Sequence, residues 1–304
     1  MRITNSLIGA CMALGVAAVP AAAQSVGRML VDDFKHAGGD IWAVFTSPVD
    51  ASGKDWLLAG ATLGAAAAIS PFDDDIDRWA VRNRDSRFFA LLGPVRRGGV
   101  AYGGNRLVPV AGAVLIGGYI ARDQRIRDGV FGCAASYAAN SQIRHQVFYR
   151  FVNRARPVPG KDDALIAPPA QHGDQYDIGL SLGDSSWGDN SFPGGHVANM
   201  MTCATFLNER FEMGLVEPLL YGFAAAVGVG RIVDRGHWTS DQVVGVVFAY
   251  AIGREVALRQ RKRLERNREE GVVEVTAIPR PQREGFYLIR DDTRGIGLGW
   301  QRHF

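Results

Sequence analysis

Apolar residues recur at helical intervals over most of the chain. Between Ser25 and Pro48 they are spaced three or four positions apart, which predicts an amphipathic helix that ends before Asp50–Gly53. Six further apolar runs, rich in Ala and Gly, are of helical length: Trp56–Ile69, Leu107–Ile120, Val130–Ala139, Val197–Leu207, Leu215–Val229 and Val243–Ile252. The pattern predicts an all-α fold, a single helical bundle.

The same six runs raise the question of a membrane. A membrane-spanning helix needs about 20 apolar residues, and each of these runs is shorter and flanked by Arg or Asp. The mean hydropathy of the chain is −0.02, which is low for a chain buried mostly in lipid. We therefore favour a helical domain outside the membrane, with peripheral membrane contact. An integral membrane bundle is the less favoured alternative.

The two ends of the chain differ from its middle. Residues 1–23 have a positive start, an apolar stretch and an Ala-Ala-Ala end, which predicts a cleaved signal peptide and a periplasmic or secreted protein. Residues 24–268 form the expected helical domain, since a charged helix follows Ile252 and runs to Arg268. Residues 269–304 alternate between apolar and polar positions, which predicts a short β-like tail, a candidate β-hairpin.

Two short runs carry the candidate chemistry. His237 and Asp241 lie four apart in a helical pattern, so we expect them to share a face, with the carboxylate orienting the imidazole. His196 follows Pro193-Gly194-Gly195 and opens an apolar helical run, near the N–H groups of a helix N-terminus, which favour anions.

Arginines complete this candidate anion site. Arg231 lies six residues before His237, and Arg150, Arg154 and Arg156 lie upstream in one short segment. Two imidazoles with several guanidinium groups suit a site that holds a tetrahedral anion and moves protons around it.

Three of these segments resemble the signature motifs of the type 2 phosphatidic acid phosphatase and vanadium haloperoxidase superfamily. That family has Lys, six residues and Arg-Pro; then Pro-Ser-Gly-His; then Ser-Arg, five residues, His, three residues and Asp. Here Arg156-Pro157 closes the first motif, Pro193–His196 is the second, and Gly230-Arg231 through His237 to Asp241 is the third. The resemblance covers about residues 145 to 255.

Three positions depart from the family pattern. Tyr149 stands at the lysine of the first motif, and Gly194 and Gly230 replace the two serines. No lysine lies within the motif, so Arg150 is the candidate replacement, although it is rotated by about 100° on a helix. We expect phosphate binding that is weakened but not abolished.

The resemblance implies a metal-independent phosphatase for phosphate monoesters, with lipid phosphate favoured as the substrate. His237 would be the nucleophile that forms a phosphohistidine, with Asp241 orienting it, and His196 would serve as acid and base. Arg156, Arg231, Arg150 and the N–H groups of Gly194 and Gly195 would bind the phosphoryl oxygens. No cofactor is expected.

Two other functions stay open. The same pocket could hold vanadate in a haloperoxidase, or the departures from the motifs could indicate a phosphate- or phospholipid-binding protein without catalysis. A net charge of +3 is too small to argue for a nucleic-acid partner.

Other residues receive structural interpretations. Cys133 and Cys203 lie in small-residue helical runs and are expected to be buried thiols, with a disulfide as the alternative. Asp73–Asp77 is expected to be a charged helix start and not a calcium loop. His145 is expected to be structural, Asn153 and Arg154 to be either supporting groups or exposed, and residues 158–192 to form either an active-site lid or a passive loop.

Overall fold

The computed structural model describes residues 25–95, 107–158, 174–176, 178–179, 190–270, 285–291 and 295–301. The chain divides into two units, Met1–Lys262 and Arg263–Phe304. The expected signal peptide lies outside the described residues, and so does most of the segment from Val158 to Phe192.

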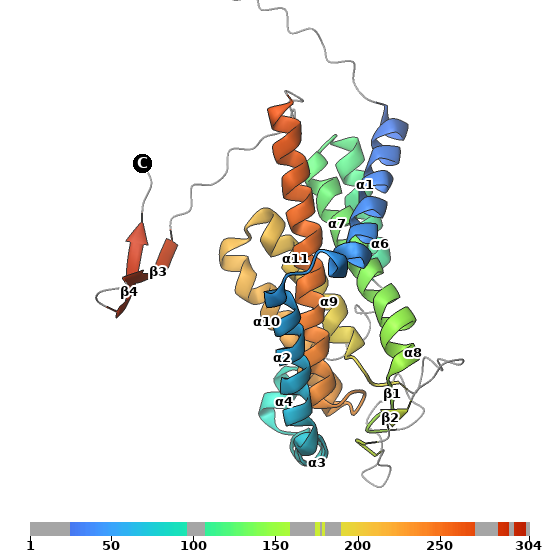
Figure 1. Cartoon of the computed structure of the whole chain (residues 1–304), viewed down its shortest axis with the longest axis vertical. Helices are drawn as coiled ribbons and strands as arrows, with labels where there is room; N and C mark the ends of the chain where they lie inside the picture. The colour runs from blue at the N-terminus through green and yellow to red at the C-terminus, as the bar shows by residue number, and fades with distance from the viewer. Residues whose placement is uncertain are drawn as a thin grey trace, which may run out of the picture. The chain divides into compact units, whose positions relative to one another are not determined.

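Helices make up nearly all of the described part of the first unit (Figure 1). The longer ones are α1 (Val26–Thr46), α2 (Gly53–Ile69), α3 (Asp73–Asn83), α6 (Leu107–Ile120), α7 (Gln124–Ile143), α9 (Gly195–Phe211), α10 (Glu217–Val233) and α11 (Thr239–Glu269). Shorter pieces are η1 (Ser47–Val49), η2 (Ser70–Phe72), α4 (Arg87–Leu91), the π-helical turn η3 (Arg144–Phe148), α8 (Tyr149–Phe151) and η4 (Gly214–Val216). The all-α prediction is confirmed.

Small residues let α7, α9 and α11 pack closely. The core joins Ala135 and Ala139 of α7, Phe206 of α9, and Ile252 and Val256 of α11. A Cβ at Gly132 would overlap the ring of Phe206, and one at Gly253 would overlap the carbonyl of Thr202. Glycine is therefore required at these contacts, which explains part of the Ala and Gly content of the runs.

A disulfide joins Cys133 on α7 to Cys203 on α9, across 70 residues of sequence. The expectation of two free buried thiols was wrong. The two Cα atoms lie 4.7 Å apart on neighbouring helices, and this separation depends on helix packing that spacing along the chain does not report.

Strands are few in the described residues. β1 (Asn153–Arg154) pairs with β2 (Ile178–Gly179) in the first unit, a pairing that the apolar pattern did not predict. In the second unit β3 (Gly285–Asp291) pairs antiparallel with β4 (Gly295–Gln301), with Gly285 opposite Gln301. The β-like tail is therefore confirmed as a hairpin.

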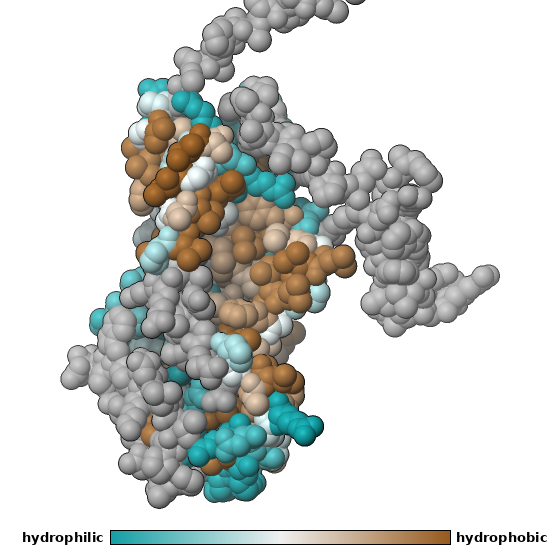
Figure 2. All heavy atoms as spheres, turned by 180° about the vertical axis from the view of Figure 1, so that it is seen from behind, coloured by the Kyte–Doolittle hydropathy of each residue, from teal (hydrophilic) through white to brown (hydrophobic). Residues whose placement is uncertain are grey.

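One described segment, Gly214–Val233, is long and apolar enough to cross a membrane by length and composition. Val108–Ile120 is apolar but shorter. Many large apolar side chains are exposed on α2, α6 and α10, and Figure 2 shows extended apolar areas on one face of the molecule.

Candidate active site

Both candidate histidines line one cavity of about 190 Å³. Their ring centroids lie 6.1 Å apart, with His196 in the first turn of α9 and His237 just before α11. The other lining residues come from α7, η3, α8, the segment after β1, and α9: Tyr137, Ser141, Arg144, His145, Tyr149, Arg156, Gly195 and Asn199. The fold therefore brings together residues from all three motifs.

A backbone carbonyl orients the ring of His237. Its Nδ1 lies 2.6 Å from the carbonyl oxygen of Ser191, which can only accept a hydrogen bond. Nδ1 therefore carries the hydrogen, and the lone pair lies on Nε2. Among the described residues Nε2 has no hydrogen-bond partner, although His237 is 2% exposed. A buried imidazole held in this way offers a nucleophilic nitrogen.

Asp241 does not contact this imidazole through any hydrogen bond in the described structure, so the prediction that it orients the ring directly was wrong. Its carboxylate accepts from the backbone N–H of Trp238 at 3.0 Å and from Nη1 of Arg154 at 2.6 Å. Trp238 is the residue before α11, and Asp241 lies in the first turn of α11. The carboxylate of Asp241 therefore caps the start of this helix. It therefore holds the loop that carries His237.

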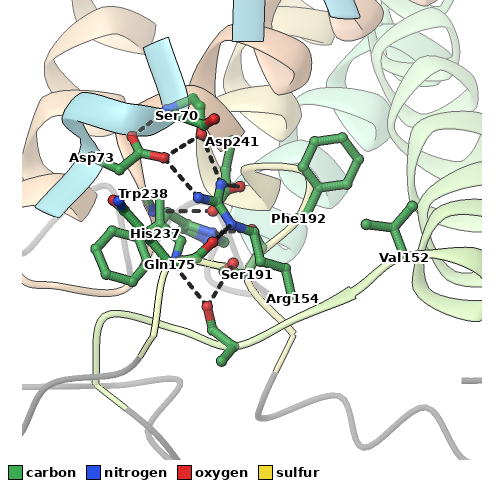
Figure 3. A network of polar contacts seen from close by, with 12 residues as sticks. Ser70, Asp73, Val152, Arg154, Gln175, Ser191, Phe192, His237, Trp238 and Asp241 are labelled. Atoms are coloured by element: carbon green, nitrogen blue, oxygen red, sulfur yellow. Dashed lines mark hydrogen bonds and ion pairs between the residues drawn. The ribbon is translucent and has the colours of Figure 1, made fainter. Parts of the chain in front are cut away.

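Arg154 is the centre of a buried polar network (Figure 3). Its guanidinium donates to Asp73 at 2.7 Å, to Asp241 at 2.6 Å and to the hydroxyl of Ser240 at 2.7 Å. Burial raises the pKa of Asp241, and the positive charge of Arg154 opposes this rise. Arg154 is thus a buried supporting group, one of the two alternatives left open by the sequence.

The aspartates at the start of α3 do more than begin a helix. Asp73 also accepts from the backbone N–H of Ser240 at 2.9 Å, and Asp77 forms an ion pair of 2.9 Å with Arg235. Arg235 has a φ of 61° and lies in the loop between α10 and α11. α3 therefore anchors the loop of the third motif, through residues about 160 positions away in sequence.

The three arginines predicted to bind phosphate lie at different distances from the cavity: Arg156 lines it, Arg231 is buried beside it, and Arg150 is exposed away from it. Arg156 lines the cavity and donates to the carbonyl of Gly236 at 3.0 Å. Arg231 is buried against Gly236 and is close enough to lower the pKa of both imidazoles, but it is not among the lining residues. Arg150 is exposed on α8 and does not line the cavity, whereas Arg144 does. The prediction for Arg150 was wrong because η3 is a π-helical turn, which changes the faces of the residues around it.

The two glycines of the second motif have different surroundings. Gly195 is the first residue of α9 and lines the cavity, where helix-terminal N–H groups lack partners within the helix. The N–H of Gly194 donates to the backbone carbonyl of Asp241 at 3.0 Å, so it is not available to an anion as predicted. A Cβ at Gly194 would meet the side chain of Gln242, which fills the space of the family's serine.

Burial and nearby positive charges keep the imidazoles at the cavity neutral. Burial, and then the positive charges of the nearby arginines, lower the pKa of His196 and of His237 well below the usual range. Burial and Arg144 lower the pKa of His145 to about 4. The cavity therefore has a positive potential from guanidinium groups and neutral bases beside it, which suits the binding of a phosphate dianion.

Sequence reasoning missed the wall formed by α7 and η3. Tyr137, Ser141, Arg144 and His145 line the cavity, and the amide of Asn199 reaches it from α9. His145 was expected to be structural. A signal was present, since Asn199 lies three residues after His196 on one helix face and Arg144 lies five residues before the family's lysine position. In the part of the chain that the structure describes, no group of three or more His, Cys, Asp or Glu could hold a metal ion.

Comparison with known proteins agrees with the motifs. Residues 130–265 match the model of the PAP2 superfamily. A stretch of 68 residues is 35% identical to the lipid A 1-phosphatase of Porphyromonas gingivalis, covering 21% of this chain and 15% of that protein. The crystal structure of the first transmembrane PAP2 type phosphatidylglycerolphosphate phosphatase from Bacillus subtilis has a TM-score of 0.42 and 18% identity, over 73% of this chain and 96% of that one. The region that matches the PAP2 superfamily contains all three motifs.

Proposed function

We propose that the protein is a phosphatase that hydrolyses phosphate monoesters through a phosphohistidine at His237. The observation that carries the proposal is the state of this imidazole: Ser191 fixes Nδ1, and Nε2 has no partner among the described residues, at a cavity lined also by His196 and Arg156. The match of residues 130–265 to the model of the PAP2 superfamily supports it.

The proposed reaction has two steps. Nε2 of His237 attacks phosphorus, the bond from phosphorus to the leaving oxygen breaks, and His196 gives that oxygen a proton. His196 then takes a proton from water, the water oxygen bonds to phosphorus, and the bond to His237 breaks to release phosphate. His196 must be protonated for the first step. A bound phosphate dianion would raise its pKa by offsetting the nearby guanidinium charges.

The phosphoryl oxygens are bound by fixed donors. Arg156 and the N-terminal N–H groups of α9 at Gly195 lie at the cavity, and Arg231 adds a buried positive charge beside it. These groups need no reorganisation when negative charge develops on the oxygens, which is the main source of rate enhancement in such sites. The proposal assigns no role to a metal or other cofactor.

Lipid phosphate is the proposed substrate class. A cavity of 190 Å³ is smaller than the roughly 300–1,000 Å³ of sites that enclose a whole drug-sized ligand. It accommodates a phosphate and its first attached atoms, so the rest of the substrate lies outside. The relative from P. gingivalis is a lipid A 1-phosphatase, which supports a lipid substrate.

Membrane contact is proposed from the exposed apolar helices. On α2, Trp56, Leu57 and Leu58 are each more than half exposed, and Ala66 is the one residue of α2 that is buried. Exposed apolar areas of this extent mark contact with a membrane or a partner. We propose contact with the membrane that holds the lipid substrate, on the periplasmic side if the predicted signal peptide is used.

A phosphate-release assay tests the proposed activity. Purified protein should release phosphate from phosphatidate, phosphatidylglycerophosphate, lipid A or p-nitrophenyl phosphate, with no loss in EDTA. His237→Ala should abolish release and His36→Ala, a histidine on α1, should not. Acid-labile ³²P trapped on the wild type but not on His237→Ala would identify the phosphohistidine. Halide oxidation that requires vanadate would favour a haloperoxidase, and phosphate binding without turnover on any substrate would favour a binding protein.

A further inference from the structure

Arg144 is a buried cation at the cavity. It is 8% exposed, yet no carboxylate among the described residues forms an ion pair with it. The buried Arg127, Arg154 and Arg235 each bind an aspartate within 3 Å. A buried guanidinium without a carboxylate is costly, and such a cost is expected where an anionic ligand supplies the missing charge.

The π-helical turn explains how position 144 can replace position 149. In a π-helix the N–H of one residue bonds to the carbonyl five residues earlier, and the N–H of Tyr149 donates to the carbonyl of Arg144. Both residues line the cavity, and the guanidinium carbon lies 5.9 Å from the centroid of the Tyr149 ring. Arg144, one π-helical turn before Tyr149, thus supplies the positive charge that the family has on its lysine. Tyr149 itself lines the wall of the cavity.

Two buried amides hold the guanidinium in place. The side-chain oxygen of Asn199 accepts from Nη1 of Arg144 at 3.4 Å and from Nδ2 of Asn140 at 3.0 Å. Asn140 on α7 is 1% exposed and Asn199 on α9 is 4% exposed. The same Nη1 lies so close to Gly195 that a Cβ there would overlap it. The guanidinium is therefore fixed between the amide of Asn199 and the first residue of α9.

We propose that Arg144 binds the phosphoryl group of the substrate directly, and that Asn199, held by Asn140, is the residue that positions it. This rests on the proposed function, since the ligand is the phosphate of that reaction. Arg144 touches the ligand, whereas Asn140 and Asn199 act through Arg144.

The first experiment compares arginine variants on p-nitrophenyl phosphate, with inorganic phosphate as a competitive inhibitor. Arg144→Ala should lower kcat/KM by about 10²- to 10³-fold, as expected for the loss of one transition-state donor. It should also raise the inhibition constant of phosphate at least about tenfold, the equivalent of roughly 1.4 kcal/mol. Arg144→Lys should recover part of both losses. Arg87→Ala, an exposed arginine on α4, is the matched control and should change neither.

Two results would overturn the assignment of Arg144. One is a folded Arg144→Ala with kcat/KM and phosphate inhibition within about threefold of the wild type. The other is a larger loss for Arg150→Ala than for Arg144→Ala. If the wild type releases no phosphate, the proposed function fails, but Arg144 is still tested: inorganic phosphate should raise the Tm of the wild type and not that of Arg144→Ala.

The second experiment separates positioning from general stability. Asn199→Ala should lower kcat/KM, and the double variant Arg144→Ala, Asn199→Ala should lose no more than Arg144→Ala alone, because the amide acts through the guanidinium. Asn140→Ala should give a smaller loss with the same lack of additivity. If the fold losses in kcat/KM of the two single variants multiply in the double variant, Asn199 acts independently of Arg144. That result would overturn the positioning role of Asn199.

Discussion

Two neighbouring regions of the molecule are built on buried arginines, and they differ in what those arginines contact. In the network at Arg154, the guanidinium binds the carboxylates of Asp73 and Asp241. At the cavity, Arg144 has an amide and an aromatic ring beside it, and the described residues offer it no carboxylate. The first arrangement is complete without a ligand, whereas the second leaves positive charge for one.

The difference separates support from binding. The Arg154 network joins α3, β1 and the start of α11, and so fixes the loop that carries His237. Burial and then the positive charges of the cavity arginines lower the pKa of the imidazoles, and the arginines present donors to an anion. The same residue type therefore serves structure or chemistry according to its partners, and substitution should affect stability in one region and ligand binding in the other.

The largest effect is expected from Arg154→Met. It leaves the buried carboxylates of Asp73 and Asp241 without a cation, and breaking a buried ion pair from one side costs roughly 3–5 kcal/mol. Urea unfolding should show this loss. Arg78→Met, which removes surface ion pairs on α3, is the control and should cost far less, because exposed ion pairs contribute little to stability. Equal losses for the two variants would mean that the Arg154 network adds no special stability.

A bound anion should stabilise the folded protein by neutralising the positive charge at the cavity, as the aspartates neutralise Arg154 in the network. Inorganic phosphate at about 100 times its Kd should stabilise the wild type by about 2.7 kcal/mol, because it binds only the folded state. Thermal unfolding at increasing phosphate, with chloride at matched ionic strength as the control, measures this. Identical shifts with chloride would indicate screening of charge and no specific site.

Acid should weaken the fold through the cavity imidazoles. Their folded pKa values are lowered, so between pH 6.5 and the lowered pKa the unfolded chain binds more protons than the native protein. Their contribution is therefore present above pH 6.5 and is lost as the pH falls, over pH 6.5 to about 4 for His145. The slope is at most about 1.4 kcal/mol per pH unit for each imidazole.

Unfolding of the wild type and His145→Asn between pH 7.5 and 5.5 checks this prediction. The variant should show the shallower dependence on pH. A dependence as steep as that of the wild type would show that His145 does not contribute.

The smallest effect on stability is expected from Arg144→Met. The oxygen of Asn199 keeps its hydrogen bond from Asn140, and no described carboxylate loses a partner. The free energy of unfolding in the absence of phosphate should fall by less than about 1 kcal/mol, because the variant also removes a costly buried charge. Measurement beside Arg154→Met makes the contrast direct, and a loss of 3 kcal/mol or more would place Arg144 with the structural arginines.

Local patterns were enough for the helices and the principal site residues. Apolar periodicity predicted the helical bundle, and alternation predicted the tail hairpin, because both depend on which face of a segment is apolar. The spacing of His196, Arg231 and His237 carried the resemblance to the superfamily whose model matches residues 130–265. Their convergence at one cavity followed from the resemblance and not from spacing alone.

Other features depend on contacts between distant segments, which the sequence by itself does not determine. The carbonyl that orients His237 belongs to Ser191, and any residue type carries the same backbone group, so no letter in the sequence marks it. The disulfide needs a Cα separation that arises only when α7 packs on α9. Arg144 faces the cavity because a π-turn shifts its register, and Asp73 supports α11 because α3 folds back against it. The sequence therefore determined the helices and the reactive residue types, whereas tertiary packing decided which neighbours orient and charge them.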